Sequence, residues 1–235
     1  MGRKKPIGKK FWNKEYGSNT HLALSETPSE DLEKFVRFLM RDSGKKLLNP
    51  TSTALDLGCG NGRNLIYLAE EFGIRGVGFD ISNEAIKQAR KRSSELQLQL
   101  QYEVRSIAEP IPVQDESQTL VLDMMSSHFL NEQERKNLVS EVARVLKPGG
   151  WFFWKTFLLN EDKHAERLLA EHPGEEKNTY IHPEIGVAEH VFTVDEIEEL
   201  LGNNFIIHKV LKSHGHKRKS GGKRRSVSVY AERNW

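Results

Sequence analysis

The segment Ala54-Leu-Asp-Leu-Gly-Cys-Gly-Asn-Gly-Arg-Asn64 restricts the fold of this 235-residue chain more than any other feature. It joins a short apolar run, typical of a buried strand, to three glycines and then to a helical pattern. Glycine is needed where the backbone turns tightly or approaches a ligand too closely for a Cβ atom. In a dinucleotide fingerprint the glycines occupy the first, third and sixth positions, whereas here the sixth position is Arg63. No Gly-Lys-Ser/Thr follows either, so the loop predicts a nucleoside ligand without a pyrophosphate.

Short apolar runs alternate with helical patterns along the rest of the chain. Strands are predicted over residues 53–58, 75–80, 100–105, 118–124, 151–157, 205–211 and 226–231. Helices are predicted over residues 61–72, 82–96, 131–147 and 193–202. Strands separated by helices of this length form βαβ crossovers and a parallel sheet that is covered on both faces. The sequence therefore predicts an α/β fold with a Rossmann-like, doubly wound sheet of seven strands, mostly parallel, which ends in an antiparallel C-terminal hairpin.

Three capping boxes indicate where helices begin. They start at Thr27, Asn131 and Thr193, and each has a glutamate three residues later. Between the last two helices, residues 158–192 contain prolines and several histidines and are predicted to be irregular. Residues 1–26 carry basic and aromatic side chains and are predicted to be a mobile arm, followed by one domain over residues 27–235.

Composition and charge indicate a globular chain with two basic extensions. No apolar run is long enough to span a bilayer, the N-terminus lacks the apolar part of a secretory signal, and the single cysteine fits a reducing cytoplasm. Residues 1–10 hold five Lys/Arg and residues 209–225 hold eight, with no acid in either segment. The remainder carries 22 basic against 33 acidic residues. An anionic partner would therefore be attracted by the two extensions; solubilising segments are the alternative.

A carboxylate stands twenty residues beyond Gly60, where the second predicted strand ends. Gly78-Phe-Asp80 closes that strand, and Asp80 is placed to accept hydrogen bonds from both hydroxyls of a ribose. The alternative is an aspartate that caps the following helix, but Ser82 can serve as that cap. The glycine loop and Asp80 together predict a nucleoside site.

In these motifs the chain resembles the class I S-adenosylmethionine (SAM)-dependent methyltransferases. Leu55–Asn64 resembles their first motif, Gly78–Ser82 the second, Leu120–Asp123 the fourth, and Val145–Gly150 the turn into the fifth strand. These motifs follow in order over residues 50–157, and the terminal hairpin is similar to the antiparallel sixth and seventh strands of that fold. The resemblance implies the strand order 3-2-1-4-5-7-6, SAM as the cofactor, and methyl transfer as the reaction.

The resemblance also implies a set of cofactor-binding residues in the loop, at strand ends and in the third motif. They are Asp56, Gly58, Cys59, Gly60, Asn61, Gly62, Asp80, Ile81, Ile107, Ala108, Asp123 and Met124. Asp56 and the loop would hold the aminocarboxypropyl part of SAM, Asp80 the ribose, and Ile81 the adenine.

The third motif, Ser106–Pro112, departs from the family pattern at one position. Many members carry an acid for the adenine amino group where this chain has Ile107, so the backbone amide of Ala108 is the remaining adenine contact. Cys59, between two binding glycines, is interpreted as a small packing residue rather than a nucleophile.

Asp123 and His128 are the candidate catalytic residues. Methyl transfer from a sulfonium needs alignment and exclusion of water, and an amine, thiol or hydroxyl acceptor must also lose a proton. Both residues follow the strand whose end faces the sulfonium in the family; a packing role is the alternative for His128. The sequence Asp123-Met-Met-Ser-Ser127 lacks the Asn/Asp-Pro-Pro-Tyr/Phe of enzymes that methylate adenine or glutamine. No cysteine follows the fourth or fifth strand, which disfavours C5-methylation of pyrimidines.

Five residues are candidates for contacts with the methyl acceptor: Trp12, Tyr16, Tyr180, His182 and His190. Trp12 and Tyr16 could close over the site as an N-terminal lid or could be core anchors. The other three lie in the segment where the family inserts acceptor-binding elements, although a solvated loop is the alternative. Their spacing matches no zinc pattern, so no metal is expected.

Two classes of acceptor stay open. RNA or another anionic macromolecule would bind through residues 1–10 and 209–225, and the loop 212–225 could follow phosphates. That loop has no aromatic residue to stack on a base, which weakens a single-strand interpretation. A small metabolite or toxic anion is the alternative, because the first motif resembles that of tellurite-resistance-type methyltransferases. A SAM-binding protein without transferase activity is a third hypothesis.

Overall fold

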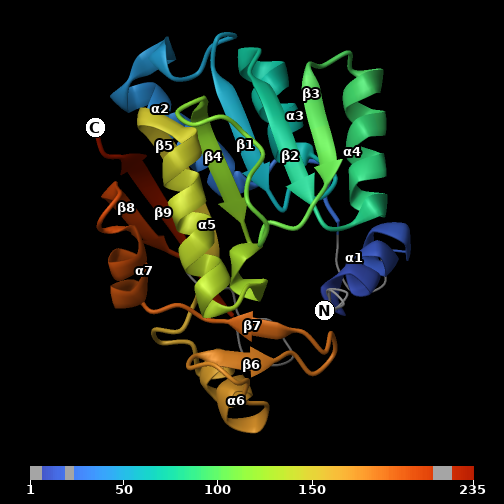
Figure 1. The fold of residues 1–235 in the computed structure, drawn as a ribbon, viewed down its shortest axis with the longest axis vertical. Coiled ribbons are helices and arrows are strands. Elements are labelled where there is room, and N and C mark those ends of the chain that lie inside the picture. The colour runs from blue at the N-terminus through green and yellow to red at the C-terminus, as the bar shows by residue number, and fades with distance from the viewer. Residues whose placement is uncertain (1–6, 19–23, 214–223) are drawn as a thin grey trace. The chain divides into compact units, whose positions relative to one another are not determined.

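The computed structural model describes residues 7–18, 24–213 and 224–235. The chain separates into two compact units, which comprise residues 1–109 and 110–235 and are called here the first and the second unit. Figure 1 shows the elements of both units along the chain. Among the described residues, no helix is long and apolar enough to cross a membrane.

Seven strands follow the order β3-β2-β1-β4-β5-β9-β8, which is the order that the family resemblance implies. They are β1 (Thr53–Leu57), β2 (Arg75–Asp80), β3 (Leu100–Val104), β4 (Gln118–Met124), β5 (Leu146–Leu158), β8 (Phe205–Lys212) and β9 (Arg225–Arg233). β1, β2 and β3 pair in parallel, as do β4 and β5, whereas β9 is antiparallel to both β5 and β8. The predicted fold class is confirmed.

The first unit packs its helices on the three parallel strands. Its helices are α1 (Ile7–Ser18), α2 (Glu30–Asp42), α3 (Arg63–Phe72) and α4 (Asn83–Glu95), with the 3-10 turn η1 (Gly44–Lys46). α3 contacts all three strands and α4 contacts β2 and β3, and the absence of a side chain at Gly76 of β2 leaves room for the buried Leu65 of α3. α4 begins as predicted, because the Ser82 side chain accepts from the Ala85 amide. Figure 1 shows α1 beyond the arrowheads of β2 and β3, beside the first turn of α4.

The start of the chain has a helix that was not predicted and lacks a predicted cap. The helix α1 lies within the predicted arm and packs against α4. Thr27 does not cap the next helix: α2 begins at Glu30, and Ser29 stands at its N-cap without a side-chain capping bond. The reason is a long-range contact, because the Ser29 amide donates to Asn64 Oδ1 at 3.2 Å instead.

The second unit has an aromatic core on its strands. Its further elements are η2 (Ser127–Phe129), α5 (Glu132–Val145), α6 (Lys163–Glu171), β6 (Thr179–Ile181), β7 (Ala188–His190) and α7 (Val194–Leu201). α5 packs on β5, and Trp151, Phe153 and Trp154 of β5 are buried. β5 begins five residues earlier than predicted, at Leu146, because the Pro-Gly-Gly turn joins the strand through an irregular register opposite Gln118.

Residues 158–192 are not irregular as predicted, since they form α6 and the hairpin β6–β7. Asp162 starts α6 by accepting from the His164 and Ala165 amides. Ala165 and Leu168 of that helix pack with Tyr180 and Val191 in a small core. Figure 1 shows these elements beyond the arrowhead of β4. The signal in the sequence was an acidic N-cap followed by apolar residues at helical spacing.

The two remaining capping boxes differ in outcome. Asn131 and Glu134 form the complete predicted box at the start of α5. At α7 only half of the box forms, because Thr193 accepts from the Glu196 amide at 3.1 Å but the Glu196 carboxylate contacts His190 Nε2 at 2.7 Å. The Glu196 carboxylate thus binds the buried His190 instead of the Thr193 amide at the start of α7.

Candidate functional site

The glycine loop turns immediately after β1 and is attached to the end of β2. The amides of Gly58 and Cys59 both donate to the Phe79 carbonyl, at 2.8 and 2.9 Å. Gly58, Gly60 and Gly62 have φ of 75°, 56° and 77°, in the left-handed region that favours glycine. Because three of its five residues, 58–62, have no side chain, the loop allows the close main-chain approach that a bound nucleoside requires.

Asp80 connects this loop to the first turn of α4. The Gly60 amide donates to Asp80 Oδ2 at 2.9 Å, and the Ser82 amide donates to Asp80 Oδ1 at 2.8 Å. Burial raises the pKa of the carboxyl group, while the two amide donors oppose that shift. A carboxylate offers about four lone-pair positions, so each Asp80 oxygen keeps acceptor capacity after these bonds. Asp80 thus fixes the loop and can still bind hydroxyl groups.

Cys59 is a packing residue in this structure. Its side chain is buried, and a Cβ atom added to Gly78 would lie 2.8 Å from its Sγ and 2.7 Å from Cδ1 of Tyr102. Gly78 therefore makes the room that Cys59 and Tyr102 fill. Burial raises the pKa of the Cys59 thiol well above its usual value, so the thiol stays protonated and unreactive.

The other predicted cofactor residues of the first unit have these surroundings. Asp56 is buried on β1 opposite Gly78 of β2. The side-chain nitrogen of Asn61 donates to the Ser25 carbonyl at 3.0 Å. Ile81 and Ile107 are partly buried. The Ala108 amide donates to Ser106 Oγ at 3.2 Å, so a contact with adenine would have to replace or share this bond. Their cofactor roles stay predictions.

Trp12 and Tyr16, the two candidates on α1, have different surroundings. The Trp12 ring packs edge-on against Phe11 with 5.1 Å between ring centroids. Tyr16 lies against the glycine loop: a Cβ atom added to Gly60 would be 2.3 Å from the Tyr16 hydroxyl oxygen. The structure thus brings Tyr16 to the predicted cofactor loop.

In the second unit, Asp123 organises the turn after β4. It is fully buried, and its Oδ1 accepts from the Ser126 hydroxyl at 2.6 Å and from the Ser126 and Ser127 amides at 3.2 Å. Burial raises the pKa of Asp123, and the serine donors oppose that shift. The neighbouring Met124 is half-buried, and Met125 adopts a positive φ of 70° in this turn.

His128 is buried next to that turn. Its ring packs against Phe129 and Phe157, at centroid distances of 4.1 and 4.9 Å. Burial lowers the pKa of His128 to about 3, with a smaller opposing effect from Glu189. The ring is therefore neutral at physiological pH and is a weak base, although its role as a catalytic base stays a prediction.

An ion pair between a buried carboxylate and a partly exposed arginine, absent from the sequence predictions, lies beside His128. The Glu189 carboxylate accepts from the Tyr180 hydroxyl at 2.6 Å and contacts Nη2 of Arg224 at 2.7 Å. The Arg224 guanidinium also stacks on the Phe157 ring, 3.3 Å from its centroid. Burial works against ionisation of Glu189, but the nearby positive charge and the Tyr180 donor keep its pKa below the usual value. The only signal of this pair in the sequence was the acidic residue Glu189 in the short strand β7.

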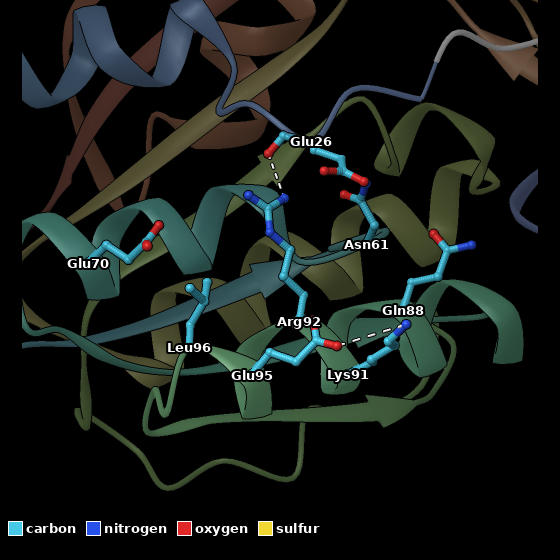
Figure 2. A pocket seen from close by; sticks show the side chains of 8 residues that line it. All are labelled: Glu26, Asn61, Glu70, Gln88, Lys91, Arg92, Glu95 and Leu96. Atoms are coloured by element: carbon cyan, nitrogen blue, oxygen red, sulfur yellow. Dashed lines mark hydrogen bonds and ion pairs between the residues drawn. The ribbon is translucent and has the colours of Figure 1, made fainter.

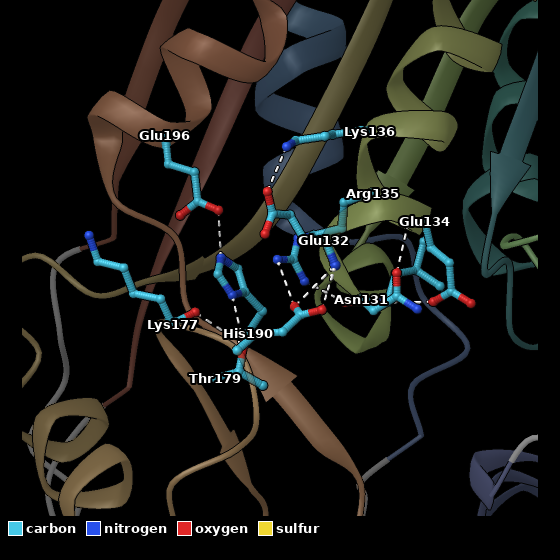
Figure 3. A network of polar contacts seen from close by, with 11 residues as sticks. Asn131, Glu132, Glu134, Arg135, Lys136, Lys177, Thr179, His190 and Glu196 are labelled. Atoms are coloured by element: carbon cyan, nitrogen blue, oxygen red, sulfur yellow. Dashed lines mark hydrogen bonds and ion pairs between the residues drawn. The ribbon is translucent and has the colours of Figure 1, made fainter.

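A second polar network holds the hairpin β6–β7 (Figure 3). His190 contacts Thr179 Oγ1 through Nδ1 at 3.0 Å and Glu196 through Nε2, so both ring nitrogens have partners. Arg135, which is almost fully buried, pairs with Glu176 at 3.2 Å. His182 differs from His190 because it is half-buried and accepts from the amides that follow it. Acceptor contacts of Tyr180, His182 and His190 stay predictions.

The basic extensions are only partly described. Residues 1–6 and 214–223, which contain Lys217, Arg218, Lys219 and Lys223, lie outside the described residues. Within the described end of the loop, Arg224 pairs with Glu189 and Arg225 with Glu161 at 2.9 Å. Two cations that were predicted to follow phosphates are thus engaged by carboxylates of the same chain.

The described residues hold no metal cluster but do form an open pocket. Over residues 7–18, 24–213 and 224–235, no group of three or more His, Cys, Asp or Glu side chains could hold a metal ion. An open pocket of about 430 Å³ lies on the first unit, where Asn61 and Arg92 face the backbone of residues 25–26 (Figure 2). Its lining is charged and polar except for Leu96, so it has the character of a solvated groove.

Comparison with known proteins agrees with this geometry. Residues 54–150 match the family described as "Methyltransferase domain". A SAM-dependent methyltransferase structure from Methanosarcina mazei superposes with a TM-score of 0.67 and 25% identity, covering 80% of this chain and 95% of the other.

Two curated relatives match over shorter parts. The fatty-acid O-methyltransferase of Mycolicibacterium smegmatis is 28% identical over 69% of this chain and 58% of its own length. The glycine/sarcosine/dimethylglycine N-methyltransferase of Actinopolyspora halophila is 32% identical over 57% of this chain and 24% of its own length. The chain thus spans little more than half of the first relative and a quarter of the second. Residues 54–150 thus form a methyltransferase domain, and the glycine loop, the strand order and these matches support a class I SAM-dependent methyltransferase.

Proposed function

We propose that this protein transfers the methyl group of SAM to a small-molecule acceptor. The observation that carries the cofactor half of this proposal is the link from the Gly60 amide to Asp80, which joins a glycine-rich loop to a buried carboxylate. Those residues fit SAM, because a nucleoside needs close access to the main chain and an acceptor for its ribose. Bound SAM supplies an electrophilic methyl group on a sulfonium.

The residues of the first unit would bind and orient the cofactor. Asp80 would accept from the ribose hydroxyls with the lone pairs that its two amide bonds leave over. Asp56 and the loop from Gly58 to Gly62 would bind the aminocarboxypropyl part, and Ile81 would pack on the adenine. These contacts align the reacting groups, which is the main requirement of a methyl transfer.

The second unit would bind the acceptor and exclude water. Asp123 and Met124 would face the reacting methyl group, and Tyr180, His182 and His190 would contribute polar contacts. His128 is neutral and buried, so it could accept a proton only as a weak base. An acceptor whose proton leaves to solvent is therefore favoured over one that needs a strong base.

Two observations favour a small molecule over RNA. The relatives with curated names act on a fatty acid and on glycine and its methylated derivatives, according to those names. Arg224 and Arg225 are paired within the chain and would have to lose carboxylate partners before they could bind phosphates. RNA remains the alternative acceptor.

The test is incubation with methyl-labelled SAM and a cell extract separated into small-molecule, RNA and protein fractions. We expect label in the small-molecule fraction with the wild type, and none with Asp80→Ala. Label in RNA that disappears as salt is raised would overturn the small-molecule proposal in favour of the RNA alternative. SAM binding without label in any fraction would support a non-catalytic binding protein instead.

A further inference from the structure

Helix α1 is attached to the start of α4 by specific hydrogen bonds. Asn13 Oδ1 accepts from the Asn83 amide at 2.8 Å and from the Ser82 hydroxyl at 3.0 Å. Gln88 Nε2 donates to the Tyr16 carbonyl at 2.6 Å. Asn13 thus binds the helix start that directly follows Asp80, and α1 has a defined position next to the predicted ribose site.

The backbone after α1 is bound from the other side of the glycine loop. Asn61, within the loop, donates to the Ser25 carbonyl, and Arg92 of α4 donates to the Glu26 carbonyl at 2.7 Å (Figure 2). Asn64 of α3 accepts from the Ser29 amide. These contacts recognise main-chain atoms, so they fix where the segment runs irrespective of its own side chains. Both ends of the N-terminal region are therefore tied to residues that surround the loop.

Between these attachments the Tyr16 ring lies on Gly60. A Cβ atom at position 60 would be 2.3 Å from the Tyr16 hydroxyl oxygen and 3.2 Å from Cζ, so only glycine allows this approach. Gly60 is also the residue whose amide donates to Asp80. Among the residues that the structure describes, the Tyr16 hydroxyl makes no hydrogen bond. Burial and the nearby Asp80 raise the pKa of Tyr16, so the hydroxyl keeps its proton at physiological pH.

We propose that Tyr16 is a SAM-binding residue, and that α1 forms a wall of the cofactor site. The Tyr16 hydroxyl donates a hydrogen bond to an oxygen atom of the bound cofactor, while the ring limits access of water to the Gly60 region. The inference rests on the proposed function, because it assumes that the loop binds SAM. It assigns Tyr16 to the cofactor rather than to the acceptor and makes α1 part of the site.

The test compares Tyr16→Phe, Tyr16→Ala and Tyr67→Phe by calorimetry with SAM and S-adenosylhomocysteine. Tyr67 is a suitable control because it lies on α3 in the same unit and packs against Phe72 with 6.3 Å between ring centroids. We expect Tyr16→Phe to weaken binding about 5- to 10-fold, as the loss of one hydrogen bond predicts. Tyr16→Ala should weaken it further, because the wall is lost too, and Tyr67→Phe should leave it unchanged.

A second readout uses the lysines of α1. Trypsin should cleave after Lys10 and Lys14 more slowly when S-adenosylhomocysteine is bound to the wild type, and this protection should be reduced in Tyr16→Ala. Unchanged affinity in Tyr16→Phe, with binding lost in Asp80→Ala, would overturn the inference and leave the proposed function standing. Tighter binding by Tyr16→Ala would also overturn it, because the ring would then obstruct the cofactor. A wild type that binds neither compound would remove the proposed function itself.

Discussion

The first and the second unit stabilise their candidate site residues in different ways. In the first unit, the important contacts involve the main chain. Two loop amides donate to the Phe79 carbonyl, and the amides of Gly60 and Ser82 donate to Asp80. In the second unit, local amides also bind Asp123, but other contacts join side chains that are far apart in sequence, such as Glu189 and Arg224.

This difference separates what a local motif can specify from what it cannot. A main-chain site needs glycine at defined positions and one carboxylate at a fixed distance, so it leaves a compact pattern in the sequence. A pair of buried side chains can be exchanged for other pairs or for apolar residues of similar volume. We therefore expect substitutions in the two units to act on different quantities, namely cofactor affinity in the first and stability in the second.

The largest effect is expected for Arg224→Met. This change leaves the buried Glu189 carboxylate without its cation, and breaking such a pair costs about 3–5 kcal/mol. The free energy of unfolding, measured by urea denaturation, should fall by about 3 kcal/mol. The affinity for SAM should not change, because Arg224 is not among the predicted cofactor residues.

The double variant Glu189→Gln with Arg224→Met is the matched control. It removes both charges, so much of the lost stability should return. If the double variant is as unstable as Arg224→Met alone, the cost comes from lost packing on Phe157 and the ion pair is not the cause.

The same contrast explains how far the sequence alone predicted the structure. The glycine turn after β1 and the Asn131 capping box depend on residues that are close in sequence, and the structure has both. The cofactor roles of the loop and Asp80 stay predictions. The Thr27 cap failed because Asn64, far along the chain, binds the Ser29 amide. At Thr193 only one bond of the capping box forms, because the Glu196 carboxylate binds His190. No local pattern encodes such competition.

The N-terminal helix and the Glu189–Arg224 pair were missed for the same physical reason. The α1 sequence is basic, and its position depends on hydrogen bonds to Ser82, Asn83 and Gln88 rather than on a strong apolar stripe. Arg224 belongs to a run of basic residues that looks solvated in sequence. Only the folded chain shows that its end is buried against Phe157 and Glu189.

The next effect concerns acid sensitivity in the second unit. Folding lowers the pKa of His128 from 6.5 to about 3, so below pH 6.5 the unfolded chain binds a proton that the folded chain does not. Stability should therefore be lost as the pH falls from about 6.5 toward 3, by about 3 kcal/mol at pH 4 from this residue alone.

The measurement compares wild type and His128→Phe by urea denaturation at pH 7 and pH 4. The phenylalanine keeps a ring between Phe129 and Phe157 but cannot titrate. Its stability should decrease less between the two pH values than that of the wild type. Equal decreases would mean that His128 is accessible to protons in the folded state.

A smaller effect is expected at the third motif of the first unit. If Ile107 occupies the position of the family's adenine-binding acid, Ile107→Asp should leave the affinity for SAM unchanged or increase it by about 1 kcal/mol, the value of one hydrogen bond. The control is Val104→Asp, which adds the same charge at a side chain that is 40% exposed on β3. Weaker binding in Ile107→Asp alone would show that the pocket there is apolar.

The most direct test of the cofactor site is calorimetry of SAM and S-adenosylhomocysteine with wild type, Asp80→Ala and the exposed control Asp42→Ala. Asp80 is the one predicted ligand that also holds the Gly60 amide, and losing a charged hydrogen bond costs about 1.5–3 kcal/mol. Circular dichroism would establish that all three proteins are folded. We expect wild type and Asp42→Ala to bind both compounds equally well, and Asp80→Ala to bind them at least about 10-fold more weakly. Equal affinity in all three proteins would contradict the assignment of the glycine loop and Asp80 as the SAM site.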